Sequence, residues 1–232
     1  MSAVVELSHL SKNYGGLRPL RLDRFLLSDD EQAAILGVDR AAAETLINLI
    51  TGATLPDTGE VRVFGRPTAE ITDSADWLGV VDRFGILTER AVLLDSLTAI
   101  QNLAMPFSLE IEPLADDLRA KATALAREVG LSEAGWDGPA GSLDALDRAR
   151  LRFGRALALS PSVLLLEHAT AALERPSVIV FARDIRRAAA GRAIATLTLG
   201  ADADFATAVA DRVLTLDPAT GKLAARRRRW FM

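Results

Sequence analysis

Short apolar runs alternate along this chain with longer segments in which apolar residues recur at helical spacing. The apolar runs predict strands over residues 4–10, 20–27, 33–36, 60–64, 78–81, 163–166, 193–199 and 212–216. The helical spacing predicts helices over residues 45–50, 97–105, 115–129, 178–190 and 205–210. The run at 163–166 is apolar throughout, which is typical of a strand in the middle of a parallel sheet. The alternation therefore predicts an α/β protein.

The segment 32–65 contains the most informative order of predicted elements. A short apolar strand is followed by a loop that opens at Gly37, a helix that ends at Thr51 and Gly52, a turn and another strand. This is the order of a strand, a phosphate-binding loop and a helix. Residues 88–150 differ in character, since they are predicted to be helical and are punctuated by Pro106 and Pro113.

Composition narrows the possible function. The chain has 232 residues, of which half are apolar and a quarter charged, with a net charge of −4. Cysteine is absent, which excludes disulfides and thiol catalysis. A membrane span is not expected, since no apolar run reaches the roughly 18 residues that a span needs. A secretory signal is not expected either, since Glu6 and His9 interrupt the first apolar segment. The acidic balance argues against nucleic acid as a partner, and a cytoplasmic location is the default.

The order of these segments from about residue 4 to 225 resembles the nucleotide-binding subunits of ABC transporters. The resemblance implies a P-loop NTPase-type ABC ATPase fold, with a mainly parallel sheet core, an N-terminal antiparallel β portion and an α-helical subdomain. We expect a single domain over 1–232, with a core at about 1–87 and 151–225. The helical subdomain would cover about 88–150, and a basic tail 226–232.

The phosphate loop departs from the family pattern, which ends in Gly-Lys-Ser/Thr. Gly37 and Thr45 are kept, but Ala43 stands for the lysine and Glu44 for the magnesium-binding hydroxyl. We place Glu44 in the first helical turn, where a carboxylate stabilises the helix by about 0.3–1 kcal/mol. It would also repel phosphate, at about 4 kcal/mol per pair of like charges 4 Å apart. Both effects stay open, and no nearby cation is expected to offset the carboxylate.

Further positions of the family site are also changed. Tyr14 occupies the place of the adenine-stacking aromatic, although a half-exposed turn aromatic is the simpler interpretation. Arg83 is aligned with the family's glutamine, where it either pairs with Glu44 or Glu167 or is solvated. Asp144 falls in the degenerate signature Leu-Asp-Ala-Leu-Asp and is expected to cap a helix.

The end of the strand at 163–166 carries Glu167 in place of the magnesium-binding aspartate and His168 in place of the catalytic glutamate. Ala201 replaces the switch histidine. His168 is a conceivable base, but without a bound phosphate a structural role is favoured. A metal site formed by Glu44, Glu167 and His168 is conceivable on residue type alone and is not expected.

These losses predict a catalytically inactive ABC-type subunit, a pseudo-ATPase, with no catalytic residue, metal or cofactor. Its expected partners are a membrane permease and an ATPase-like subunit, in a homo- or heterodimer at the inner face of the membrane. Apolar residues at 86–87 and 91–94 suggest the permease-docking surface. The basic tail either contacts anionic lipid, a permease edge or nucleic acid, or is solvated; its arginines are Arg226, Arg227, Arg228 and Arg229.

Two alternatives remain. In an atypical ATPase that uses ATP and magnesium, Arg40 would replace the loop lysine, while Glu167 and His168 would handle metal and water. In a soluble adaptor without a permease, the arginine tail would make the contacts.

Overall fold

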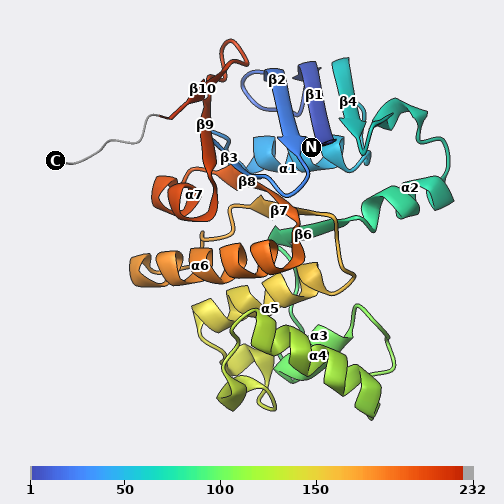
Figure 1. Cartoon of the computed structure of the whole chain (residues 1–232), viewed down its shortest axis with the longest axis vertical. Coiled ribbons are helices and arrows are strands. Elements are labelled where there is room, and N and C mark those ends of the chain that lie inside the picture. Colours follow the sequence, from blue (N-terminus) through green and yellow to red (C-terminus); the bar gives the residue numbers. More distant parts are fainter. Residues whose placement is uncertain (1, 227–232) are drawn as a thin grey trace.

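The computed structural model describes residues 2–226, which form two sheets and the helices that cover them (Figure 1). The smaller sheet has the order β2-β1-β4-β5, and the larger one β10-β9-β3-β8-β7-β6. The strands are β1 (Ala3–Lys12), β2 (Leu20–Ser28), β3 (Gln32–Leu36), β4 (Thr58–Val63), β5 (Arg66–Pro67), β6 (Phe84–Thr88), β7 (Val163–Glu167), β8 (Ala195–Gly200), β9 (Arg212–Leu216) and β10 (Leu223–Ala225). The smaller sheet is antiparallel, as predicted for the N-terminal portion.

The larger sheet is parallel except for β10 at its edge. Its strands β3, β7 and β8 are buried at every position. This explains the apolar runs in β3 and β7, whereas β8 alternates apolar residues with the buried Thr196 and Thr198. The helices are α1 (Arg40–Ile50), α2 (Ser74–Val81), α3 (Ala99–Ala104), α4 (Asp116–Glu128), α5 (Ala145–Leu157), α6 (Arg175–Arg192) and α7 (Ala203–Val209). Short 3-10 turns occupy Thr68–Glu70, Glu133–Gly135 and Ala140–Ser142.

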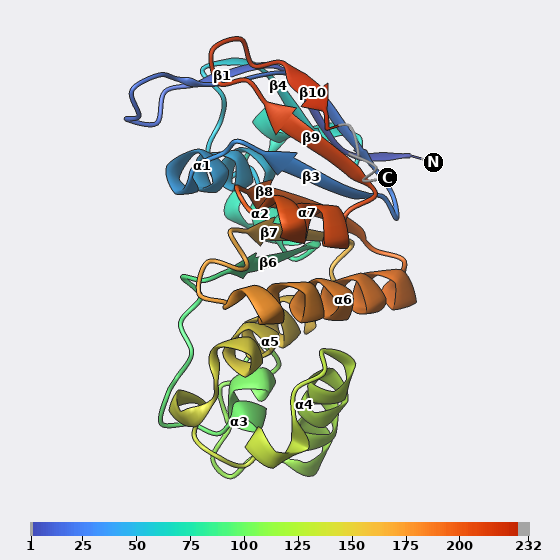
Figure 2. The ribbon, with the colours of Figure 1, turned by 90° about the vertical axis from the view of Figure 1, so that its left-hand side faces the viewer.

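Two cores lie on opposite faces of the larger sheet. Successive residues of β7 alternate between them: Val163 and Leu165 pack with α1 and the smaller sheet, whereas Leu164 and Leu166 pack with α5, α6 and α7. Helices α3 and α4 lie at the end of the molecule farthest from the smaller sheet, beyond α5, in both views (Figures 1 and 2).

One predicted strand is a helix, and one predicted helix starts earlier than expected. Residues 78–81 belong to helix α2, which begins after the N-cap Asp73, and the edge strand β6 follows it at 84–88. A short apolar run does not distinguish a strand from a helix by itself, because both bury such runs. Helix α1 starts at Arg40, five residues before the predicted start, because Asp39 caps it.

Among residues 2–226, none of the helices has the length and apolar character that a membrane crossing requires.

Candidate functional site

The loop between β3 and α1 keeps the shape of a phosphate loop. Gly37 has φ +85°, and a Cβ there would lie 2.9 Å from the carbonyl oxygen of Leu216, so glycine is required. The next turn is closed by Asp39, whose carboxylate accepts a hydrogen bond from the Ala42 amide at 2.8 Å. One of the amides that would face a phosphate is therefore already bonded to the chain's own carboxylate.

Glu44 is not in the first turn of α1, and the capping role predicted for it is wrong. Asp39 is the cap, and Glu44 is the fifth residue of the helix. Its carboxylate instead lies 2.5 Å from Arg90, on the loop that follows β6. Glu44 is thus paired with a cation that the sequence analysis did not expect.

Arg90 joins three parts of the structure. One guanidinium nitrogen contacts Glu44 on α1, and the other contacts both carboxylate oxygens of Glu167 at the end of β7, at 2.7 and 2.9 Å. The Glu167 side chain is only 4% exposed, while Arg90 and Glu44 are about half-exposed. Hydrogen bonds to Glu44 and then to Glu167 raise the pKa of Arg90. We name Glu44, Arg90 and Glu167 the ion triad.

Of the two alternatives for Arg83, pairing with Glu44 or Glu167 is wrong, and the residue is exposed. Its guanidinium lies 3.3 Å from the centre of the Phe64 ring, and burial lowers its pKa. The misplaced strand caused the error, because the residue that directly follows the observed strand β6 is Glu89. The Glu89 carboxylate pairs with Arg40 at 2.9 Å.

Asp144 caps α5 as expected, since its carboxylate accepts from the Asp147 amide at 2.8 Å.

Tyr14 is half-buried against the core next to α1, and burial together with the charge of Asp39 raises its pKa. Thr45 donates to the carbonyl oxygen of Ala41, one turn earlier in α1, at 2.7 Å. Ala43 is fully buried and offers no polar group to a ligand.

His168 directly follows Glu167 in the chain, but neither His168 nor Ala201 takes part in the ion triad. Both line a cavity with Thr198 and Phe205, on the face of the sheet opposite α1. Within the described part of the chain, no three acidic or histidine side chains are placed to hold a metal, so the set Glu44, Glu167 and His168 is not assembled.

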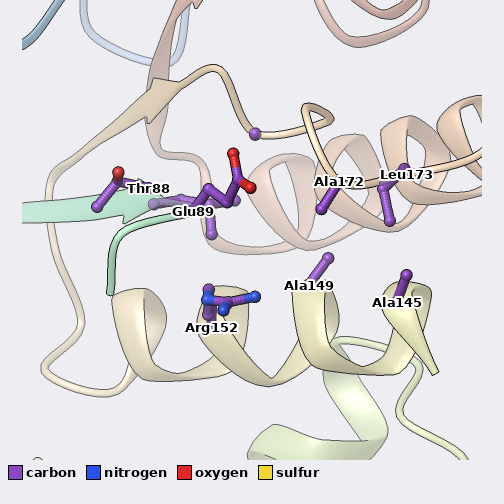
Figure 3. A pocket seen from close by; sticks show the side chains of 9 residues that line it. Thr88, Glu89, Ala145, Ala149, Arg152, Ala172 and Leu173 are labelled. Carbon is purple, nitrogen blue, oxygen red and sulfur yellow. The ribbon is translucent and has the colours of Figure 1, made fainter. Parts of the chain in front are cut away.

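A small gap lies between the end of β6, the loop after β7 and helix α5. It has a volume of about 20 Å³, and Figure 3 shows Ala149 of α5 facing Ala172 across it, with Glu89 and Arg152 to one side. The Arg152 guanidinium donates to the Ala91 carbonyl oxygen at 2.9 Å, and Arg155 donates to the carbonyl oxygen of Val92 at 2.6 Å. The loop after β6 is therefore held by the core on one side and by α5 on the other.

Of the predicted basic tail, only Arg226 is described. Its side chain is exposed, and its backbone amide donates to the Val213 carbonyl oxygen. Arg227, Arg228 and Arg229 lie outside the described residues.

The chain is similar to several proteins named as methionine import ATP-binding proteins. It is 30% identical to the one from Brucella abortus and 31% identical to the one from Mesorhizobium japonicum, each over 217 residues. Those matches cover 92% of this chain and 57% and 58% of the relatives, so the chain spans a little over half their length. No family model matches the sequence.

Solved ABC cassettes share the fold. The structure of cbiO1 from Clostridium perfringens, described as part of the cbiONQ transporter complex, superposes with a TM-score of 0.81 at 19% identity. That match covers 97% of this chain and 88% of the other. A dimeric ATP-binding cassette bound to ADP and Pi gives a TM-score of 0.76 at 21% identity, covering 98% of this chain and all of the other. By sequence and by fold, the chain belongs to the ABC nucleotide-binding domain family.

Proposed function

We propose that this chain is a subunit of an ABC transport complex that neither binds nor hydrolyses ATP by itself. Its partners are a membrane permease and an ATPase-like subunit, with which it lies at the cytoplasmic face of the membrane. The names of its relatives support the transporter setting. The inactivity is argued from this chain's own residues, since function resides in the site and not in the fold.

The observation that carries the proposal is the ion triad. Glu44 and Glu167 stand where the family places groups that hold magnesium, and Arg90 already pairs both carboxylates. A magnesium nucleotide would have to displace the guanidinium and leave Glu167, which is nearly buried, without its cation. Phosphoryl transfer relies almost wholly on positioned charge, and the loop offers the apolar Ala43 where a lysine would act.

The loop after β6, which carries Arg90, supports the proposal that this chain contacts a permease. Its backbone is fixed by Arg152 and Arg155, while the Val92 side chain is 72% exposed and that of Leu94 40% exposed. An apolar side chain held outward by a rigid backbone is typical of a contact surface.

A second candidate function is ATP binding with residual hydrolysis. It is favoured by the relatives, which are named as ATP-binding proteins, and by the fold neighbour that holds ADP and Pi. In this version Arg40 contacts the phosphates. Arg40 is 61% exposed and already paired with Glu89, so that pair would have to open.

Nucleotide titration of the full chain separates the two candidates. We expect no saturable binding of magnesium ATP at concentrations up to about 1 mM, the upper range of ordinary enzyme affinities, by calorimetry or a fluorescent analogue. Micromolar binding that is weakened in Arg40→Ala but not in Arg155→Ala would establish the second function and end the first. Arg155 is the matched control because its guanidinium faces the same loop from the opposite side.

The transport setting is tested separately, by purification from membranes. Co-purification of a permease that is lost in Val92→Asp would support the proposed docking surface. Recovery of the chain free of any membrane protein under conditions that keep other transporters intact would contradict it.

A further inference from the structure

Strand β6 lies at one edge of the larger sheet, and among residues 2–226 no strand borders its outer side. The carbonyl oxygen of Arg83, just before the strand, accepts from the Val163 amide at 3.1 Å. In a parallel ladder every second residue bonds to the same neighbour, so Gly85 and Leu87 also turn their backbone groups toward β7. The backbone groups that point away from the sheet belong to the remaining residues of the strand, Phe84, Ile86 and Thr88.

The outer side of β6 is open to another strand. Within the described part of the chain, the Thr88 carbonyl oxygen is the single outward group with a hydrogen bond, from the Ala91 amide at 3.2 Å. Proteins commonly protect such an edge with a charged residue, a proline or a bulge. The sequence of β6 is Phe-Gly-Ile-Leu-Thr in an unbroken register, which has none of these, and Ile86 is 37% exposed.

Helix α2, which leads directly into β6, is apolar and yet none of its residues is buried (Figure 1). Leu78 is 50% exposed, and Trp77 is half-buried. The helix is attached by polar contacts, since the Trp77 indole donates to the Thr51 carbonyl oxygen at 3.0 Å and Asp76 pairs with Arg66. Apolar side chains that the chain itself leaves uncovered indicate a surface for a partner.

Arg83 connects α2 to β6 and brings a charge to this surface. Its guanidinium lies over the Phe64 ring, which packs against Phe84 of β6 with the ring centres 5.2 Å apart. Among residues 2–226 no carboxylate pairs with Arg83, and burial is the cause that lowers its pKa. A guanidinium that is partly removed from water and lacks an acidic partner favours a carboxylate from outside.

We propose that β6 pairs with β6 of a second copy of this chain, antiparallel and with Ile86 opposite Ile86. This register is self-complementary, because Phe84 of each copy lies opposite Thr88 of the other and each outward amide meets an outward carbonyl oxygen. The same register sets Arg83 of one copy opposite Glu89 of the other, at both ends of the paired strands. The helices α2 then lie at the rim of the contact.

A second copy fits this edge because one sequence satisfies both sides of the contact. A two-fold contact of this kind closes after two copies, so the pairing does not continue into a fibre. The inference does not rest on the proposed function, because the contact uses neither the ion triad nor the exposed Val92 and Leu94. Its tests measure assembly and not the binding of nucleotide or permease.

The chain has no cysteine, so one introduced cysteine reports which residues meet across the contact. Opposite residues of a hydrogen-bonded antiparallel pair have their Cα atoms about 5.5 Å apart, which a disulfide bridges. With oxidised glutathione, we expect the full chain carrying Ile86→Cys to become mostly covalent dimer and Leu26→Cys to stay monomeric. Leu26 is the matched control, since it is 38% exposed but lies on β2 in the smaller sheet.

Sedimentation equilibrium of the unaltered full chain measures the reversible contact. We expect a dimer with a dissociation constant of about 1–100 µM, as for a small interface. Ile86→Lys puts a charge on the edge and raises that constant about tenfold or more, without changing the melting temperature of the dilute monomer. Arg83→Ala raises it about twofold to fivefold, the worth of one accessible ion pair.

Several results would overturn the proposal. The unaltered chain stays monomeric up to roughly 1 mM, well above the expected dissociation constant. The covalent dimer forms equally from Ile86→Cys and Leu26→Cys, or Ile86→Lys leaves the dissociation constant unchanged. Crosslinking of Ile86→Cys to a different protein in membranes, and not to a second copy, would show that another strand occupies this edge.

Discussion

Glu167 belongs both to the buried core, as the end of β7, and to the ion triad, as a partner of Arg90. It is the last residue of a buried parallel strand, and its carboxylate is almost inaccessible. A buried carboxylate needs a compensating cation, and in a nucleotide site the metal would supply it. Here the chain supplies it through Arg90, so the Glu167 carboxylate has a cation partner without a ligand.

Tyr14 permits a prediction at the same scale, because it is the only tyrosine in the chain. Burial, and then the charge of Asp39, raise its pKa, so its phenolate absorbance should appear at higher pH in the folded protein than in urea. In Asp39→Asn the folded midpoint should fall part of the way, since burial is the larger cause and asparagine still caps α1.

The sign for stability follows from that shift. The neutral phenol is favoured in the folded state, so this contribution is fully present below the ordinary pKa of tyrosine and is lost as pH rises through the folded pKa. Equal phenolate midpoints in the native and the urea-unfolded protein would contradict the placement of Tyr14.

At the scale of elements, the loop after β6 depends on a buried side chain in α3. Asn102 is fully buried, accepts from the Leu94 amide at 2.9 Å and donates to the carbonyl oxygens of Leu94 and Thr98, both at 3.0 Å. The Asn102 side chain thus bonds backbone groups of this loop that a neighbouring strand would otherwise bond. The loop keeps one shape while its apolar side chains stay exposed.

Asn102→Ala is expected to lower the free energy of unfolding by about 1–3 kcal/mol, because it leaves the Leu94 amide without a partner. The carbonyl oxygens of Leu94 and Thr98 each lose one hydrogen bond but keep one from a backbone amide. Amide exchange at Leu94 should also become much faster. Thr98→Ala is the control: it removes the α3 cap, costs about 1 kcal/mol and leaves the Leu94 amide bonded. Unchanged Leu94 protection in Asn102→Ala would show that the loop is held in another way.

At the scale of the whole molecule, the order of elements was predictable and the ion pairs were not. The buried strands 33–36 and 163–166 stand out as apolar runs, so their places in the sheet follow from the sequence. The ion triad joins Arg90 to residues 46 positions earlier and 77 later, which no local pattern reveals. Residues 78–81 form part of α2 and the strand follows at 84–88, so Arg83 precedes the strand and does not follow it.

Side chains of α6 form ion pairs with both α4 and α5. Arg192 in its last turn makes a two-pronged pair with Glu128 of α4, at 2.6 Å for each bond, and also donates to the Leu157 carbonyl oxygen. Arg150 of α5 donates twice to Asp184 in the middle of α6, at 2.7 and 2.9 Å. These contacts bring α4, α5 and α6 together around buried charge, which makes their loss costly.

Asp184 offers the sharpest test of that connection. Its side chain is 8% exposed and that of Arg150 15%. Asp184→Ala therefore leaves a nearly buried guanidinium with one acidic partner among residues 2–226, Asp147. We expect a loss of about 3 kcal/mol in the free energy of unfolding, measured in urea with an unchanged slope. Arg187, the other partner of Asp184, is 61% exposed, so Arg187→Ala should cost less than about 1 kcal/mol. If the two substitutions cost the same, burial of the Arg150 pair does not hold α5 to α6, and the join depends on the apolar contacts between these helices alone.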